Sequence, residues 1–218
     1  MKTENGDVPT KSNRMKMNPS TKNHLARRLR YNRRGLIKTV GICAIGALLP
    51  QKAGGAQKNQ PEFKVLDEET QFDIGDKGQE IIEKAYKTGH RFEKEHGGCC
   101  RCTVAALQKS IDFIPKDKDL FRAASCLDGG ATPNGIQNCG AFTGLGMVIG
   151  WLCGANKFGN TKLSHTLIRQ VYKQFEKEYG SVLCKDIRKK INRDCPEVVA
   201  RAAKWTAEIL LRQFTNYQ

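Results

Sequence analysis

The chain has 218 residues, enough for one ordinary domain and an appendage. Its formal charge of +15 is concentrated at one end, because the first 56 residues hold 12 of the 37 Lys and Arg but only 2 of the 22 Asp and Glu. The remainder is mildly basic, without a sustained Arg/Lys stripe or an aromatic stacking platform, which argues against nucleic acid as a partner.

Residues 1–56 are predicted to be a signal segment of the twin-arginine type. Arg33 and Arg34 precede Leu-Ile-Lys and an apolar run over residues 39–49, which is too short to span a bilayer. A basic region, an apolar region and the small residues Gly54-Gly55-Ala56 follow the order of a signal peptide. This pattern predicts export to the periplasm or another extracytoplasmic space, with membrane contact only during export. The alternatives are an uncleaved anchor and a disordered basic arm.

Residues 57–218 are predicted to form one helical redox domain. Apolar residues recur at helical spacing nearly throughout, and no convincing alternating strand is present. The predicted fold is therefore all-α, a bundle of about five to six helices preceded by the signal segment. In chain order the expected helices cover about 81–96, 104–114, 117–127, 136–153, 167–179 and 196–210.

The expected helix at 136–153 is apolar all round, which predicts that it lies at the centre of the bundle. Its glycines recur four residues apart, as Gly140 and Gly144 and again as Gly146 and Gly150, so a neighbouring backbone could approach closely. Its apolar stretch of about fifteen residues is shorter than a membrane span. A core helix is therefore expected rather than a transmembrane one.

Eight of the nine cysteines follow the signal segment, and four of these are predicted at helix N-termini: Cys102, Cys139, Cys184 and Cys195. Unpaired backbone N–H groups and the helix dipole favour a thiolate there, and a thiolate is both a nucleophile and a metal ligand. Four such ends converging would hold an iron–sulfur cluster or one soft metal ion. Cys153 lies roughly 21 Å along the helix from Cys139 and is expected to be a packing thiol.

These cysteines also stand in a recognisable sequence context. Cys102-Thr-Val-Ala-Ala-Leu is followed by Gly129-Gly130, by Cys139-Gly-Ala-Phe-Thr-Gly, by Tyr179-Gly-Ser-Val-Leu-Cys184 and by Cys195. From about Gly98 to Leu211 the chain resembles the C_GCAxxG_C_C family of redox-active proteins. The resemblance implies a helical fold and redox activity, through bound iron or a thiol pair, with functional cysteines at Cys102, Cys139, Cys184 and Cys195.

Exported relatives of that family include split-Soret cytochromes, which carry c-type haem. Cys99 and Cys102 have the two-residue spacing of haem attachment, but Thr103 stands where the axial His must follow. No c-type haem is therefore expected. The pair Cys99 and Cys102 could instead form a redox dithiol, because Arg101 and a helix N-terminus would both lower a thiol pKa there.

The sequence thus favours an exported redox protein that holds an iron–sulfur or other metal centre on Cys102, Cys139, Cys184 and Cys195. It would pass electrons to a partner protein rather than transform a substrate by acid–base chemistry. The chain itself could form a homodimer. The first alternative is a thiol–disulfide oxidoreductase that uses Cys99 and Cys102. The second is a disulfide-stapled interaction module without redox chemistry, so enzymatic activity is left open.

Overall fold

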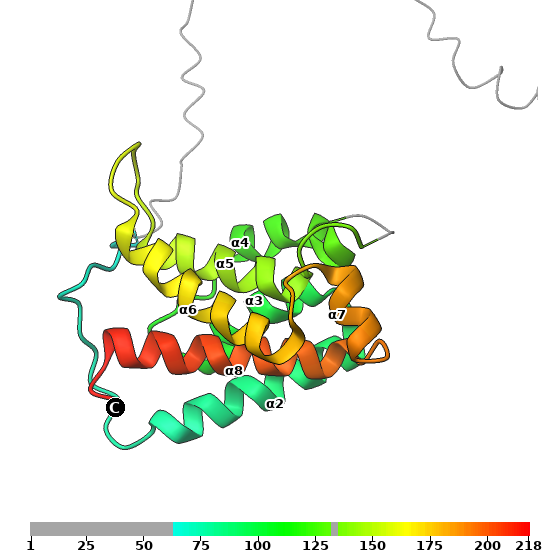
Figure 1. Ribbon diagram of the computed structural model, residues 1–218. Coiled ribbons are helices and arrows are strands. Elements are labelled where there is room, and N and C mark those ends of the chain that lie inside the picture. Colours follow the sequence, from blue (N-terminus) through cyan, green and yellow to red (C-terminus); the bar gives the residue numbers. More distant parts are fainter. Residues whose placement is uncertain (1–62, 132–134) are drawn as a thin grey trace, which may run out of the picture. The chain divides into compact units, whose positions relative to one another are not determined.

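The computed structural model describes residues 63–131 and 135–218 (Figure 1). The predicted signal segment at 1–56 lies outside these residues. The described part is all-α, as predicted, and its only pairings of β type are isolated bridges between Phe72 and Thr215 and between Asn138 and Leu183. Within it there are seven helices: α2 (Gly78–His96), α3 (Cys99–Ser110), α4 (Lys118–Ala123), α5 (Gly140–Cys153), α6 (Lys162–Tyr179), α7 (Cys184–Lys190) and α8 (Cys195–Phe214).

The six expected helices correspond to α2, α3, α4, α5, α6 and α8, and α7 is the short helix that the sequence predicts to begin at Cys184. Two 3-10 turns, η1 (Ala124–Cys126) and η2 (Asp128–Gly130), follow α4. Helix α5 begins at Gly140 rather than near residue 136, because the preceding segment is hydrogen-bonded to the segment before α7. The amide of Cys139 donates to the carbonyl of Val182 at 2.8 Å, and the amide of Cys184 donates to that of Gln137 at 2.9 Å.

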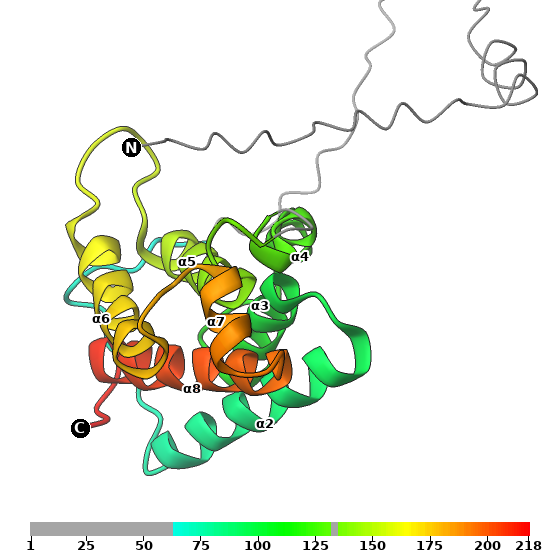
Figure 2. The ribbon, with the colours of Figure 1, turned by 45° about the vertical axis from the view of Figure 1, so that its right-hand side comes forward.

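Two helices share the interior of the bundle. Helix α5 packs against α3, α6 and α8, as its apolar sequence predicts, and α8 packs against α2, α3, α5 and α6. Figures 1 and 2 show α8 lying alongside α2. Helix α8 can do so because small and branched apolar side chains face its neighbours and are fully buried, among them Val199, Ala203 and Leu210. None of the helices in the described part is both long and apolar enough to cross a membrane.

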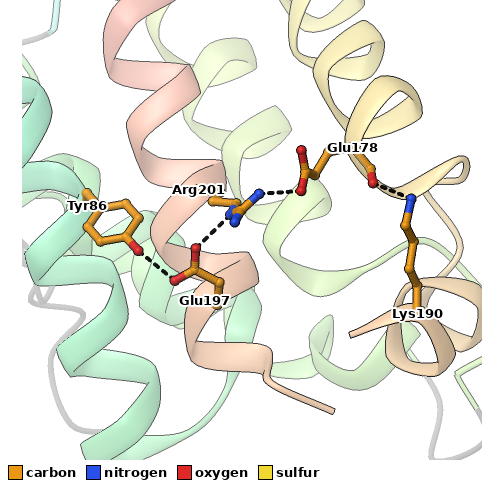
Figure 3. A network of polar contacts seen from close by, with 5 residues as sticks. All are labelled: Tyr86, Glu178, Lys190, Glu197 and Arg201. Carbon is orange, nitrogen blue, oxygen red and sulfur yellow. Dashed lines mark hydrogen bonds and ion pairs between the residues drawn. The ribbon is translucent and has the colours of Figure 1, made fainter. Parts of the chain in front are cut away.

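A chain of polar contacts links α2, α6 and α8 at the surface (Figure 3). Tyr86 donates a hydrogen bond of 2.6 Å to Glu197. Arg201 contacts Glu197 through Nε at 2.6 Å and Glu178 through a terminal nitrogen. Lys190 of α7 donates to the backbone carbonyl of Glu178. Arg201 is therefore the residue through which α6 and α8 are joined by charge.

Replacing Arg201 with Gln should lower the free energy of unfolding by about 1 kcal/mol, a modest amount because its side chain is 36 % exposed and water screens both ion pairs. Urea denaturation measures this change. Arg212→Gln is the matched control, since Arg212 is an exposed residue of the same helix. Equal effects of the two substitutions would show that the ion pairs of Arg201 contribute nothing specific.

A candidate cysteine redox site

A cavity of about 450 Å³ opens at the end of the bundle where α3 and α8 begin. Its walls come from the end of α2, the start of α3, both 3-10 turns, α7 and the start of α8. Three cysteines line it, namely Cys99, Cys126 and Cys195. Charged groups line it too, namely Glu93, Asp128 and Arg188. Thiols and ionisable groups therefore face one shared space.

Four cysteines stand at or next to the first residues of helices. Cys99 is the first residue of α3, Cys184 of α7 and Cys195 of α8, while Cys139 is the N-cap of α5. Cys195 is not itself the N-cap of α8, because the Asp194 side chain takes that role by accepting from the amide of Glu197 at 3.4 Å. The sequence placed Cys102 at a helix start, but the helix begins one turn earlier, at Cys99.

Two of the buried thiols, those of Cys99 and Cys139, interact with each other. Both are buried, with 8 % and 6 % of their surfaces exposed. The absence of a side chain at Gly140 makes this contact possible, because a Cβ there would lie only 2.4 Å from the sulfur of Cys99. The Cys-Gly pair at the start of α5 thus supplies one thiol and the space for the other.

The surroundings of Cys99 and Cys139 shift the pKa values of the two thiols in opposite directions. The pKa of Cys99 is lowered from 9.0 to about 6, chiefly because Cys139 donates a hydrogen bond to it, and the backbone N–H groups of Gly129 and Gly140 add to this. The same contact with Cys99, together with burial, raises the pKa of Cys139 well above 9.0. Of the two sulfurs, Cys99 is therefore the one whose surroundings favour the thiolate, and a thiolate is the nucleophile of thiol–disulfide exchange.

Cys102 faces a different partner. Its thiol donates to the carbonyl oxygen of Gly97 at 3.2 Å and lies beside the carboxyl group of Glu93. Burial, followed by the charge of Glu93, raises the pKa of Cys102 to about 12. The structure therefore pairs Cys99 with Cys139 and Cys102 with Glu93, and does not join Cys99 to Cys102.

Cys184 and Cys195 both interact with Arg188. Burial raises the pKa of both thiols, the guanidinium of Arg188 opposes this, and the charge of Cys99 adds to it. Arg188 also hydrogen-bonds Cys195. The charge of Cys99 thus acts on Cys139, Cys184 and Cys195, whereas Cys102, the fourth predicted ligand, lies beside Glu93.

The described cysteines are all free thiols. In residues 63–131 and 135–218, no three Cys, His, Asp or Glu side chains are arranged to hold a metal ion. Cys153 is buried and bonds the Ile149 carbonyl of its own helix at 3.2 Å. Cys100 is buried 3.9 Å from the sulfur of Met147, and Cys126 is exposed at the cavity.

Three residues of the site were not among the sequence-based candidates. Asp128 accepts a hydrogen bond from the amide of Cys100 at 2.7 Å and so supports the first turn of α3. Glu93 and Arg188 flank the cavity from α2 and α7. The sequence gives a signal for Arg188, which belongs to a basic cluster over residues 185–193. Such a cluster usually indicates a solvated helix face, so it does not by itself predict a site.

An all-α bundle with a buried thiol pair beneath a cysteine-lined cavity defines a class of cysteine-based redox protein. The family described as "putative redox-active protein (C_GCAxxG_C_C)" matches residues 98–209, which is more than half of the chain. The protein belongs to this family, and redox activity is its function at that level. Comparison with curated proteins and with solved structures found no match.

Proposed function

We propose that the protein is a thiol–disulfide redox protein in which Cys99 and Cys139 alternate between a dithiol and a disulfide. The observation that carries the proposal is the interaction between these two buried thiols, where the sulfur of Cys99 lies against Gly140, the residue after Cys139, and Cys99 lines the cavity. A disulfide needs sulfur atoms about 2.05 Å apart, so thiols already in contact require little rearrangement to form one. This pairing replaces Cys99–Cys102 as the dithiol candidate.

The reaction follows from the acidity of the two sulfurs. The Cys99 thiolate attacks one sulfur of a partner disulfide, and the other sulfur leaves as a thiolate, which gives a mixed disulfide at Cys99. Cys139 then loses its proton to the departing thiolate and attacks the sulfur of Cys99, which releases the second partner thiol. The partner gains two electrons and the protein loses two. The reverse sequence reduces the protein.

Disulfide mapping of the full chain in a series of glutathione redox buffers tests this proposal. We expect one dominant disulfide between Cys99 and Cys139, which Cys99→Ser and Cys139→Ser abolish. Cys102→Ser is the matched control and should retain it, because the thiol of Cys102 donates to Gly97 and lies beside Glu93 instead. A dominant Cys99–Cys102 disulfide, or no disulfide at equilibrium with a strongly oxidising buffer, would contradict the proposal.

The metal centre predicted on Cys102, Cys139, Cys184 and Cys195 stays a prediction. The described side chains do not fit it as they stand, because no three of them are arranged to hold a metal ion and the thiol of Cys102 donates to Gly97 beside Glu93. An iron determination and a visible spectrum of anaerobically purified protein test it directly. Stoichiometric iron with thiolate charge-transfer bands, lost in Cys184→Ser and Cys195→Ser, would favour the metal centre over the dithiol.

Export by the twin-arginine route is also part of the proposal, and it is supported by the paired arginines and apolar run within residues 1–56. Cell fractionation tests it, with Arg33→Lys/Arg34→Lys as the variant. That change keeps the charge but should leave the protein in the cytoplasm.

A further inference from the structure

Two groups of opposite sign in the cysteine cavity form no ion pair with any described residue. Oxygen Oε2 of Glu93 is buried and accepts no hydrogen bond. Arg188 takes part in none of the ion pairs formed among the described residues. Burial raises the pKa of Glu93 to about 7, because its charge has no cationic partner. Arg188 contacts Cys195 but has further N–H donors to offer, so the cavity suits a ligand that brings both a cation and an anion.

The two groups belong to different walls and are not joined to each other. Glu93 is near the end of α2, and Arg188 is in the middle of α7. The sulfur of Cys195 interacts with both of them, and the sulfur of Cys99 does so as well. The cavity therefore offers an acidic site and a basic site with thiols between them.

The remaining features of the cavity limit what it can hold. Its volume of about 450 Å³ is within the range of small-molecule sites. Nη2 of Arg188 lies 3.7 Å from where a side chain on Gly129 would begin, so glycine backbone forms the wall opposite the guanidinium. Asp128 is already engaged by the amide of Cys100. A small ligand can therefore reach the guanidinium without displacing other side chains.

We propose that this cavity binds a small zwitterionic disulfide of the cystine type as the oxidant of the Cys99–Cys139 dithiol. The inference rests on the proposed function and adds the substrate class. Arg188 pairs with the carboxylate of the ligand and Glu93 with its ammonium group, which brings the ligand's disulfide bond to Cys99. The thiolate of Cys99 breaks that bond, Cys139 completes the protein disulfide, and two small thiols leave with the two electrons.

Four probes that differ in charge separate these contacts. Cystine carries both charges, 3,3′-dithiodipropionate only carboxylates, cystamine only ammonium groups, and 2-hydroxyethyl disulfide neither. The measurement is the rate of Cys99–Cys139 disulfide formation in the reduced full chain, followed by acid quenching and mass spectrometry. For each probe, the rate with the protein is divided by the rate at which the same probe reacts with N-acetylcysteine. This ratio removes differences in intrinsic reactivity among the four probes.

We expect cystine to have the highest normalised rate, at least about tenfold above the neutral probe. Arg188→Gln should lower the rates with cystine and dithiodipropionate about tenfold more than that of the neutral probe, whose change measures any effect of the substitution on Cys99 itself. Glu93→Gln should lower the rates with cystine and cystamine instead. Lys189→Gln is the matched control, because Lys189 is an exposed neighbour on α7 outside the cavity lining.

Equal normalised rates for the four probes, or a preference for cystine that survives Arg188→Gln, would overturn the substrate class. In either case the Cys99–Cys139 disulfide still forms, so the proposed function stands. If no probe produces that disulfide, the proposed function fails and the inference fails with it. Thermal melts of each variant establish that a lost rate does not reflect a lost fold.

Discussion

Replacing Gly144 with Ala is expected to destabilise the fold by about 3 kcal/mol or more, as overpacking of a rigid contact does. A Cβ at this position would lie 2.4 Å from the backbone oxygen of Cys100 and 3.1 Å from its carbonyl carbon. Backbone atoms cannot rotate away as a side chain could, so α3 and α5 would have to separate. The separation would also carry Cys99 away from Cys139. Urea denaturation gives the loss of stability, and the alkylation rate of Cys99 gives the effect on the site.

Gly150→Ala is the matched control in the same helix. Gly150 is exposed and a Cβ there meets no atom within 4 Å, so this change should stabilise the protein by about 0.5–1 kcal/mol through helix propensity. Opposite signs for the two substitutions would confirm that close approach, rather than glycine as such, matters at Gly144. A similar small gain at both positions would refute the packing of α3 on α5.

The second large effect is expected in the pH dependence of thiol reactivity. Because the pKa of Cys99 is lowered to about 6, its thiolate form persists at pH values where ordinary thiols are protonated. Its alkylation by iodoacetamide should rise with a midpoint near pH 6, and at pH 7 about nine-tenths of Cys99 should be thiolate. Tandem mass spectrometry separates Cys99 from its neighbour Cys100.

Cys139→Ala should move that midpoint up toward the ordinary thiol value of 9.0, because the hydrogen bond from Cys139 is the main cause of the lowered pKa of Cys99. Cys153→Ala is the control, since Cys153 is a buried thiol at the other end of α5, bonded within its own helix. Its removal should leave the midpoint in place. A midpoint that stays near 6 without Cys139 would mean that the thiol pair is not formed in solution.

The helices could be predicted from the sequence because their apolar periodicity is strong and their ends are marked. Gly97 and Gly180 each follow the last residue of a helix, as expected, and Pro196 stands in the first turn of α8. The glycine pattern of α5 did not predict which of its glycines contact a neighbouring helix. Gly140 and Gly144 are pressed against α3, whereas Gly146 meets only the tip of Ile168 and Gly150 meets nothing. Spacing alone cannot tell which glycines face a neighbour.

The site was harder to predict for a related reason. Cys99, Cys100 and Cys102 lie within one turn of α3, and which of them faces α5 depends on how that helix is rotated in the bundle. Packing around Val104 and Leu107, both fully buried, sets this rotation. The sequence also could not indicate that Glu93 would engage Cys102, since the two are brought together by the turn at Gly97 and Gly98.

The paired segments before α5 and α7 have a consequence for the length of the chain between them. The Cys139 amide is held by Val182, and the amides of Cys184 and Lys185 are held by Gln137 and Gly135. Adding or deleting one residue within 181–183 would shift this register and move the sulfur of Cys184 relative to that of Cys139. This stretch should therefore be a poor place to insert a tag or a linker, although it is a surface connection between two helices.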